Sequence, residues 1–407
     1  MANKRICFIV LAFPPEYSGA TLHALEFSKF LRQENIHSVF FSHTSRTDVL
    51  GWRTFEDNEV FRFKNKSFEK NHLLNYHLGL FLHLFRWRKR FDIIYLNGVW
   101  GQFWTSFYTI LFGNILKKRV FIELNMEWQS DPLCITGTSF LRLKVWMAKK
   151  VTRFISLSSA MTESFRKHSF PDDLLTYSPK AVNIQRFKPV DEEQKMKLRR
   201  KLRIPEDKRV IVTVGPVIKR KGIDFLMAVA KEVVTKMGEL HLWVVGPLRG
   251  LGVDERYVEE IMEIADSLPF NSQVKFLGKV DNVHEWLQAS DVFVFAGRQE
   301  GSPNAIREPM ACGLPVVALN LQGCTSDMIE HGKDGVLITP DNGQKFRDYH
   351  NFTLRNDACK QEFADWVVKI LNDHGLAREI GDSAREKMVR KFSMETRAKK
   401  YAEMFSG

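Results

Sequence analysis

The feature that most constrains the fold is an alternation of two sequence patterns through nearly the whole chain. Short runs of β-branched and aromatic residues, such as Val292 to Phe295, alternate with longer segments whose apolar residues recur at helical spacing, such as Leu22 to Gln33. This alternation is typical of βαβ units, in which a helix connects two parallel strands. We therefore expect an α/β protein built on doubly wound parallel sheets.

The alternation forms two series, and each series predicts one sheet. The expected strands of the first series are Arg5 to Leu11, His37 to Ser42, Asp92 to Asn97, Arg119 to Leu124 and Arg153 to Leu157. Those of the second are Arg209 to Val214, Leu240 to Val245, Val274 to Leu277, Asp291 to Phe295, Pro315 to Leu319 and Gly335 to Ile338. The charged stretch between them, Val190 to Lys208, suits a surface helix that follows a linker.

The length supports two domains. A chain of 407 residues is too long for one ordinary hydrophobic core and long enough for two domains of roughly 150 to 200 residues. We expect a first domain over residues 1–188, a second over residues 189–385, and a C-terminal helix over residues 386–407 that packs back toward the first domain. Because doubly wound sheets bind ligands at the carboxyl ends of their strands, the expected site is the cleft between the domains.

The composition limits the cellular compartment and the classes of binding partner that we expect for this chain. No segment reaches the roughly 18 consecutive apolar residues of a membrane span, and the apolar run from Ile6 to Phe13 is too short for a signal peptide. The five cysteines are scattered, with no CxxC pair and no histidine at the spacing of a zinc site. We therefore expect a cytoplasmic protein without a metal. The net charge of +12 favours polyanionic partners, but charge alone does not choose among nucleic acid, anionic lipid and phosphorylated substrates.

The segment from Glu300 to Pro315 carries the clearest chemistry. A buried strand gives way to a polar turn, after which Ser302 suits an N-cap and Pro303 suits the first position of a helix. The backbone N–H groups of Asn304 and Ala305 would then be exposed at the start of that helix. Such N–H groups form a seat for phosphate.

Two carboxylates flank this predicted phosphate seat. Glu300 lies on the loop before the helix and Glu308 about a turn and a half inside it, so both side chains can face one cleft. A carboxylate accepts hydrogen bonds from two neighbouring hydroxyl groups of a sugar or a ribose. The alternative interpretation is that both are solvated carboxylates beside an ordinary turn between a strand and a helix.

This segment, EGSPNAIREPMACGLPVVA, resembles the donor site of the family 4 retaining glycosyltransferases of GT-B fold, also described as glycosyl transferases group 1. The shared features are E-x7-E, a helix rich in small residues and the run GLPVVA. The resemblance implies two facing Rossmann-like domains with a deep cleft between them. It also implies that Glu300 lies by the donor sugar and that Glu308 binds the nucleotide ribose, with Gly301 and Ser302 in the same donor-binding loop.

Further matches occur in the order that the family shows. The lysine of the family's K-G-x-D-x-L motif, which holds the donor diphosphate, corresponds to Lys221 in VGPVIKRKGIDFL. The stretch that lines the family's base pocket resembles FLGKVDNVHEWLQASDVFVF, which places Lys279 and Val280 near the nucleobase. The glycine-containing loop after the first strand resembles FPPEYSGATLHALEFSKFL, where Gly19 lets the backbone approach the phosphates and the sugar. Taken singly, a surface lysine or an ordinary turn would also explain these positions.

Among the positions that depart from the family's pattern, three bear directly on the substrates. An arginine usually stands five residues before the diphosphate lysine, whereas this chain has Pro216 there and leaves Lys219 or Arg220 to substitute. Two positions of the first domain that often hold histidine are Asn97 and Asn125. Asparagine hydrogen-bonds a sugar hydroxyl but carries no proton near neutral pH, so these two residues would orient the acceptor without acid-base catalysis.

The resemblance implies a metal-independent retaining hexosyltransferase without a cofactor. Its substrates would be a UDP- or GDP-sugar donor and a glycan or lipid-linked acceptor, in cell-surface polysaccharide or glycolipid synthesis. Lys221, Arg220 and the helix N-terminus would neutralise the diphosphate, and retaining enzymes of this fold need no obligate protein nucleophile. Two alternatives stay open: a catalytically silent homologue that keeps the donor pocket, and a nucleotide-sugar 2-epimerase, against which the lost histidines argue.

Three segments of the first domain combine apolar and basic residues: Asn71 to Phe91, Phe103 to Lys118 and Phe140 to Lys150. Such segments lie either on an anionic membrane surface or in the core with solvated basic ends. We find no recognised nucleic-acid-binding module among them, so no nucleic-acid partner is expected. Peripheral binding to the inner face of the membrane stays open.

Overall fold

The computed structural model describes residues 4–10, 13–14, 19–44, 46–64, 72–97, 103–124, 146, 149–167, 171–250, 253–340 and 357–406. The chain divides into two compact units. The first domain comprises Met1–Lys180 and Met394–Gly407, and the second domain comprises Ala181–Ser393.

The division differs from the expected boundaries at residues 188 and 386. The segment after Lys180 packs on the second domain, because the Val182 N–H donates to the Phe392 carbonyl at 2.8 Å and Arg385 Nη2 donates to the Ile184 carbonyl at 3.1 Å. The return to the first domain begins at α14 (Met394–Ser406), since α13 (His374–Lys391) still packs on a helix of the second domain.

The first domain is built on one sheet of mixed direction, with the strand order β3-β4-β2-β1-β5-β6-β7-β8. Its strands are β1 (Lys4–Ile9), β2 (Ile36–Thr44), β3 (Gly51–Phe55), β4 (Asn58–Lys64), β5 (Ile93–Asn97), β6 (Arg119–Glu123), β7 (Arg153–Ser156) and β8 (Leu175–Tyr177). Its helices are α1 (Gly19–Gln33), α2 (His72–Arg86), α3 (Phe103–Ile115), α6 (Ser159–Lys167) and α14, with the short turns η1 (Arg88–Arg90) and η3 (Asp172–Leu174). All neighbouring strands are parallel except β3 and β4.

The sequence predicts five of these strands and misses β3, β4 and β8. The first two form an antiparallel hairpin at one edge of the sheet, and β8 is a three-residue strand at the other edge. The turn between β3 and β4 is made by Glu56 and Asp57, which both have positive φ (45° and 61°). Tight hairpin turns of this kind usually carry asparagine and glycine, so the local sequence contains no signal for this one.

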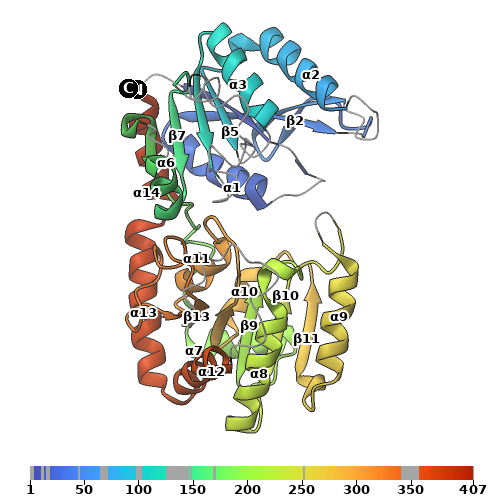
Figure 1. Cartoon of the computed structure of the whole chain (residues 1–407), viewed down its shortest axis with the longest axis vertical. Coiled ribbons are helices and arrows are strands. Elements are labelled where there is room, and N and C mark those ends of the chain that lie inside the picture. Colours follow the sequence, from blue (N-terminus) through green and yellow to red (C-terminus); the bar gives the residue numbers. More distant parts are fainter. Residues whose placement is uncertain are drawn as a thin grey trace. The chain divides into compact units, whose positions relative to one another are not determined.

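The second domain is built on a fully parallel sheet with the strand order β11-β10-β9-β12-β13-β14 (Figure 1). The strands are β9 (Val210–Val214), β10 (His241–Val245), β11 (Val274–Gly278), β12 (Val292–Phe295), β13 (Val316–Leu319) and β14 (Val336–Ile338), all six as expected from the sequence. The helices are α7 (Glu192–Leu202), α8 (Ile223–Met237), α9 (Glu255–Asp266), α10 (Val283–Gln288), α11 (Asn304–Ala311), α12 (Asp357–Asn372) and α13, with the short turns η4 (Lys219–Lys221) and η5 (Asn271–Gln273).

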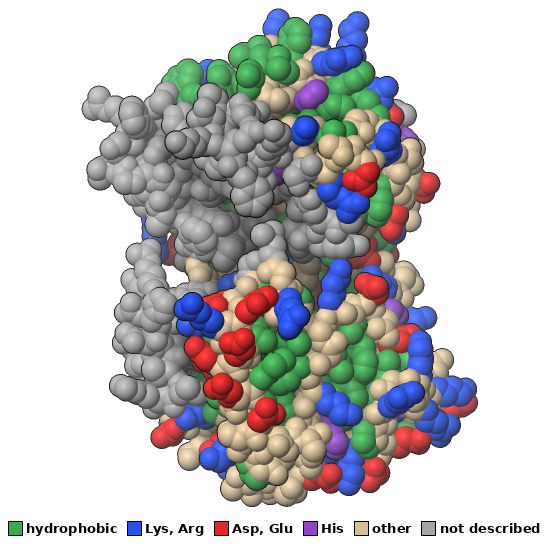
Figure 2. Space-filling model, turned by 90° about the vertical axis from the view of Figure 1, so that its right-hand side faces the viewer, with side chains coloured by type: hydrophobic (Ala, Val, Ile, Leu, Met, Phe, Trp, Pro, Cys, Tyr) green, Lys and Arg blue, Asp and Glu red, His purple; other side chains and the backbone are tan. Residues whose placement is uncertain are grey.

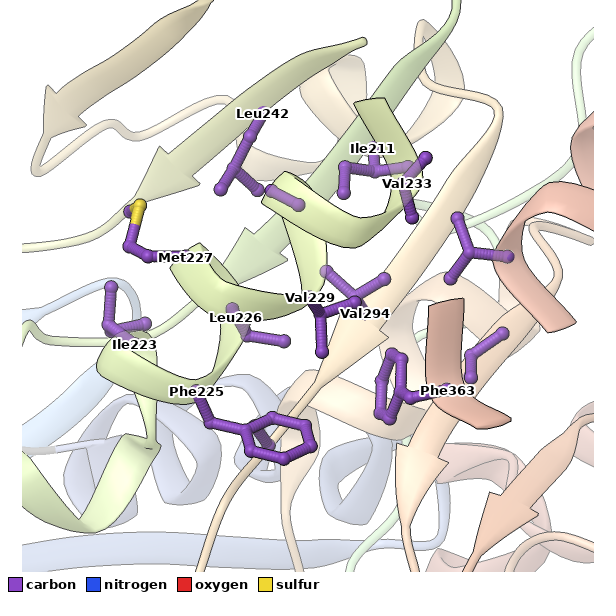
Figure 3. Packing of buried hydrophobic residues seen from close by; sticks show 14 of the residues in the cluster. Ile211, Ile223, Phe225, Leu226, Met227, Val229, Val233, Leu242, Val294 and Phe363 are labelled. Carbon is purple, nitrogen blue, oxygen red and sulfur yellow. The ribbon is translucent and has the colours of Figure 1, made fainter. Parts of the chain in front are cut away.

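Both faces of this second sheet are buried. Figure 3 shows one face, where Phe225 of α8 and Phe363 of α12 lie next to each other in the buried cluster that also contains Ile211 of β9 and Val294 of β12. The next residue of β9, Val212, belongs to the core on the opposite face. Burial on both faces explains why the strands other than the edge strand β11 are apolar runs in the sequence.

A buried ion pair ties α14 to the first domain. Arg397 Nη2 lies 2.8 Å from Glu123 Oε2 at the end of β6, and both side chains are only 4% exposed. The Tyr95 hydroxyl donates to the same carboxylate oxygen at 2.7 Å. Burial alone would raise the pKa of the Glu123 carboxyl, but the charges of Arg397 and Lys180 outweigh burial and hold that pKa below its usual value.

We expect Arg397→Met to destabilise the first domain strongly, because it leaves Glu123 buried without its main cation. The expected loss is about 3–5 kcal/mol of unfolding free energy, measured by urea denaturation at pH 7. The effect should shrink as the pH falls through the lowered pKa of Glu123, because protonation removes the charge that needs a partner. The control is Arg378→Met on the exposed face of α13, and an equal effect of the two changes would contradict the assignment.

Candidate functional site

The candidate site lies at the carboxyl edge of the second sheet. β9 and β12 are neighbours in the middle of this sheet. From β9 the chain continues to β10 on one side, and from β12 it continues to β13 on the other, so the two loops diverge from one point. Doubly wound sheets bind their ligands at such a switch point.

The loops that follow β9 and β12 are in direct contact. Gly222, which ends η4, has a φ of +66°, and a Cβ at this position would lie 2.2 Å from the Ala296 carbonyl oxygen. Only glycine fits this backbone conformation and this close approach without strain. The Arg298 N–H also donates to the Arg220 carbonyl at 2.8 Å. The two loops therefore form one unit.

Glu300 binds two cations of η4 through one oxygen. Its Oε1 lies 2.6 Å from Lys221 Nζ and 2.7 Å from Arg220 Nη1. The Glu300 and Lys221 side chains are 10% and 11% exposed, and Arg220 is 31% exposed. Two cations face one carboxylate in a mostly desolvated position, so this cluster carries a net positive charge. Such a cluster attracts an anionic ligand.

The helix after Glu300 begins one residue later than expected. Pro303 is the N-cap and not the first helical residue, and it makes no capping hydrogen bond with its side chain. Ser302 does not cap the helix, because its Oγ accepts a hydrogen bond from Arg307 Nη1 at 2.8 Å. The first N–H groups of α11, those of Asn304 and Ala305, have no acceptor inside the helix. Such N–H groups suit an anion.

Arg307 fixes the start of α11 from within the protein. Its side chain is fully buried, and Nη2 donates to the Ser302 carbonyl at 2.8 Å and to Asn304 Oδ1 at 2.7 Å. Neither Arg307 nor Arg298 was predicted as a site residue from the sequence. The available signal was a charged residue within an otherwise buried apolar segment, which marks a paired or functional charge.

The remaining predicted residues of the second domain lie on the same edge of the sheet but are not all in contact. Glu308 is half-buried on α11, and its charge, after burial, helps to raise the pKa of the Cys312 thiol. Lys279 is exposed and Val280 half-buried, directly after β11. β10 separates β11 from β9, so this pair lies farther along the edge than Lys221. Gly301 is buried beside Glu300.

The first domain has a corresponding switch point between β1 and β5. Asn97 ends β5, is 6% exposed, and donates from Nδ2 to the Ala20 carbonyl at 3.2 Å. Its Oδ1 is buried without a hydrogen-bond partner among the described residues. Gly19 is the first residue of α1. Asn125 lies outside the described residues.

Two further searches cover only the described part of the chain. It contains no group of three or more His, Cys, Asp or Glu side chains that could hold a metal ion. None of its helices has the length and apolar character needed to cross a membrane.

Residues 194–366 match the family described as glycosyl transferases group 1. This range contains Lys221, Glu300 and Glu308 in the positions that the family resemblance assigns to donor binding. The match thus covers most of the second domain and none of the first.

Relatives and solved structures agree with this family. The chain is 27% identical to the lipopolysaccharide core biosynthesis glycosyltransferase LpsE of Rhizobium meliloti, over 51% of this chain and 53% of LpsE. It is 24% identical to the N-acetyl-alpha-D-glucosaminyl L-malate synthase of Bacillus anthracis, over 51% of this chain and 48% of the relative. In these alignments the chain spans about half the length of the curated relatives.

The structure of Anabaena HepE in complex with UDP and glucose resembles the whole chain, with a TM-score of 0.76, 20% identity and coverage of 99% of both chains. This likeness shows the fold, which is the GT-B fold of two Rossmann-like α/β domains.

Proposed function

We propose that the protein is a retaining glycosyltransferase that moves a hexose-type sugar from a UDP- or GDP-sugar to a glycan or lipid-linked acceptor. The observation that carries the proposal is the cluster of Lys221, Arg220 and Glu300 at the switch point of a domain that matches the glycosyl transferases group 1 model. The HepE structure with UDP and glucose and the role of LpsE in lipopolysaccharide core biosynthesis support the donor and the kind of acceptor.

In this proposal the donor diphosphate binds the two cations of η4. Lys221 supplies a compact charge, and Arg220 supplies a planar guanidinium that can bind two phosphate oxygens at once. Arg220 thus takes the part of the arginine that the family usually has at the position of Pro216. The Asn304 and Ala305 N–H groups complete the anion seat. These groups together supply the positive charge that stabilises the diphosphate.

When the donor binds, the Glu300 carboxylate would leave the two cations and bind hydroxyl groups of the donor sugar instead. A diphosphate competes with its carboxylate for Lys221 Nζ and Arg220 Nη1, both of which now contact Glu300 Oε1. Once displaced, the carboxylate is available to accept hydrogen bonds from hydroxyl groups of the donor sugar. Glu308 would bind the ribose, and Lys279 and Val280 would lie by the nucleobase.

Catalysis would then rest on stabilising the leaving group. As the bond between the anomeric carbon and the diphosphate oxygen breaks, negative charge grows on the diphosphate, where the two cations and the helix N-terminus lower its energy. The acceptor hydroxyl forms the new bond on the face that the diphosphate leaves and gives its proton to the departing diphosphate oxygen, so the configuration is retained. Asn97 and Asn125 would orient the acceptor by hydrogen bonds, without transferring its proton.

Donor screening tests the proposal. The purified protein is incubated with UDP-, GDP- and ADP-sugars, and thermal stability and nucleotide release are measured with and without a panel of glycan and lipid-linked acceptors. We expect at least one UDP- or GDP-sugar to raise the melting temperature and to release its nucleotide when an acceptor is present. If no nucleotide stabilises the protein, the assignment of this cluster as a donor site is contradicted. Binding without turnover on any acceptor would instead indicate a catalytically silent homologue.

We expect Glu300→Gln and Lys221→Met to change nucleotide binding in opposite directions. The glutamine removes the charge that competes with the diphosphate, so UDP or GDP should bind several-fold tighter, up to about tenfold, while turnover falls. The methionine removes a phosphate ligand, so the same nucleotide should bind at least about tenfold more weakly. Isothermal titration calorimetry measures the nucleotide affinity of each variant. A similar loss of affinity in both variants would contradict the proposal that the diphosphate displaces Glu300 from the two cations.

We further propose that the first domain binds an anionic membrane surface through α2 and α3. On α2, Leu80 and Leu84 are buried, whereas Leu78, Leu82 and Phe85 are 55%, 55% and 47% exposed. These three exposed residues are spaced i, i+4 and i+7, so they form one apolar stripe along the helix. A stripe of this kind is typical of helices that lie in a membrane interface.

α3 and the residues after α2 extend this surface. α2 and α3 pack together, with the ring centroids of Phe81 and Phe112 4.3 Å apart. On α3, Leu111 and Ile115 are 37% and 56% exposed. Arg86 and η1 add basic side chains next to the stripe, and Figure 2 shows hydrophobic and basic side chains together at this end of the first domain. Of the third predicted segment, 140–150, only residues 146, 149 and 150 are described.

Vesicle flotation tests the membrane surface. We expect the protein to float with vesicles that contain phosphatidylglycerol and to bind pure phosphatidylcholine vesicles much less. Leu82→Glu should abolish flotation because it places a charge in the middle of the apolar stripe. Ile264→Glu is the matched control, since Ile264 is a 36% exposed apolar residue on α9 of the second domain. If the two variants float equally, the proposal that α2 and α3 bind the membrane is contradicted.

A further inference from the structure

We infer that Arg298 is a positioning residue that sets the distance between the cations of η4 and the loop that carries Glu300. The inference rests on the proposed donor site and adds to it a residue that would touch neither substrate. It starts from the place of Arg298 in the sequence, three residues after the end of β12 and two before Glu300.

Arg298 forms hydrogen bonds to η4 through both its backbone and its side chain. Its N–H donates to the Arg220 carbonyl at 2.8 Å, and Nη1 donates to the Lys219 carbonyl at 3.2 Å. The side chain is only 7% exposed. Two consecutive carbonyls of the turn are therefore held by one residue of the neighbouring loop. The side chains of Arg220 and Lys221 start from this fixed backbone.

The guanidinium of Arg298 is itself anchored. Nη2 lies 2.6 Å from Asp224 Oδ2 in the first turn of α8, and the Tyr257 hydroxyl of α9 donates to Asp224 Oδ1 at 3.1 Å. Burial, followed by the charge of Asp224, raises the pKa of Tyr257, so its hydroxyl remains a donor. Each oxygen of the carboxylate thus has its own partner, and Arg298 is tied to the helices that follow β9 and β10.

This arrangement leaves Arg298 no role as a phosphate ligand. Its charge is matched by Asp224, and its Nη1 and Nη2 atoms point to partners inside the protein. A planar guanidinium can bind a carbonyl and a carboxylate at the same time, whereas a lysine ammonium at this position could reach one of them. The backbone contact at Gly222 leaves no free space for η4 to shift toward Ala296. The hydrogen bonds of Arg298 oppose a movement of η4 away from Ala296.

The test compares Arg298→Lys with Arg199→Lys. Arg199 is an equally buried arginine that also pairs with one carboxylate, Asp291 Oδ2 at 2.8 Å, and with carbonyls such as that of Ala289 at 3.0 Å. Asp291 directly precedes β12, so this arginine lies at the amino edge of the same sheet, opposite the site. Both changes should lower the melting temperature, and Arg199→Lys at least as much, since Arg199 also donates to the carbonyls of Glu206 and Lys208. Arg199→Lys is therefore a stringent control for a general loss of stability.

Two readouts distinguish positioning from general stability. Hydrogen exchange of the Lys221 and Gly222 amides needs no ligand, and we expect it to accelerate in Arg298→Lys and to remain as in the wild type in Arg199→Lys. Calorimetry with UDP or GDP should show binding weakened by about tenfold in Arg298→Lys alone, since a small misplacement of catalytic groups is costly. Should Arg298→Lys not fold, Asp224→Asn tests the same link.

The outcomes separate the two proposals. Unchanged amide exchange in η4, or equal losses of nucleotide binding in the two arginine variants, would overturn the role of Arg298. If the wild type binds no nucleotide, the donor site fails, and the amide exchange still decides whether Arg298 holds the turn. Faster exchange and weaker binding confined to Arg298→Lys would support the inference.

Discussion

The chemistry of the second domain depends on a parallel sheet that is buried on both faces. Successive residues of β9, Ile211 and Val212, belong to cores on opposite sides, so neither face has room for a polar site. Charged groups can gather only where the strands end. The divergence of the chain after β9 and β12 opens that edge, which is where Lys221, Arg220 and Glu300 meet.

The electrostatics of this edge follow from its internal pairing. Two cations held next to each other in a mostly desolvated place would repel one another and would be costly to bury alone. The carboxylate of Glu300 offsets that cost and keeps Lys221 in place before any ligand arrives. A ligand of higher negative charge then meets groups that are already oriented, which is how preorganised sites reduce the work of binding.

The sequence predicted the parts of the structure that local physics determines. Five of the six predicted strands of the second sheet are buried and are therefore apolar runs in the sequence, and the sixth, β11, is a partly exposed edge strand. The missed strands β3 and β8 are also short, partly exposed edge strands. The helix start was misplaced by one residue because Arg307, five positions farther on, takes the Ser302 hydroxyl. Arg298 was missed because its partner Asp224 lies 74 residues away, a distance that no local pattern spans.

The ion pair between Arg397 and Glu123 makes the first domain discontinuous along the chain. Its sheet is complete by Tyr177, but the helix that neutralises its buried carboxylate follows the whole second domain. During synthesis, Glu123 therefore lacks the cation of α14 until the second domain has been translated. The order of the chain thus links the maturation of one domain to the completed translation of the other.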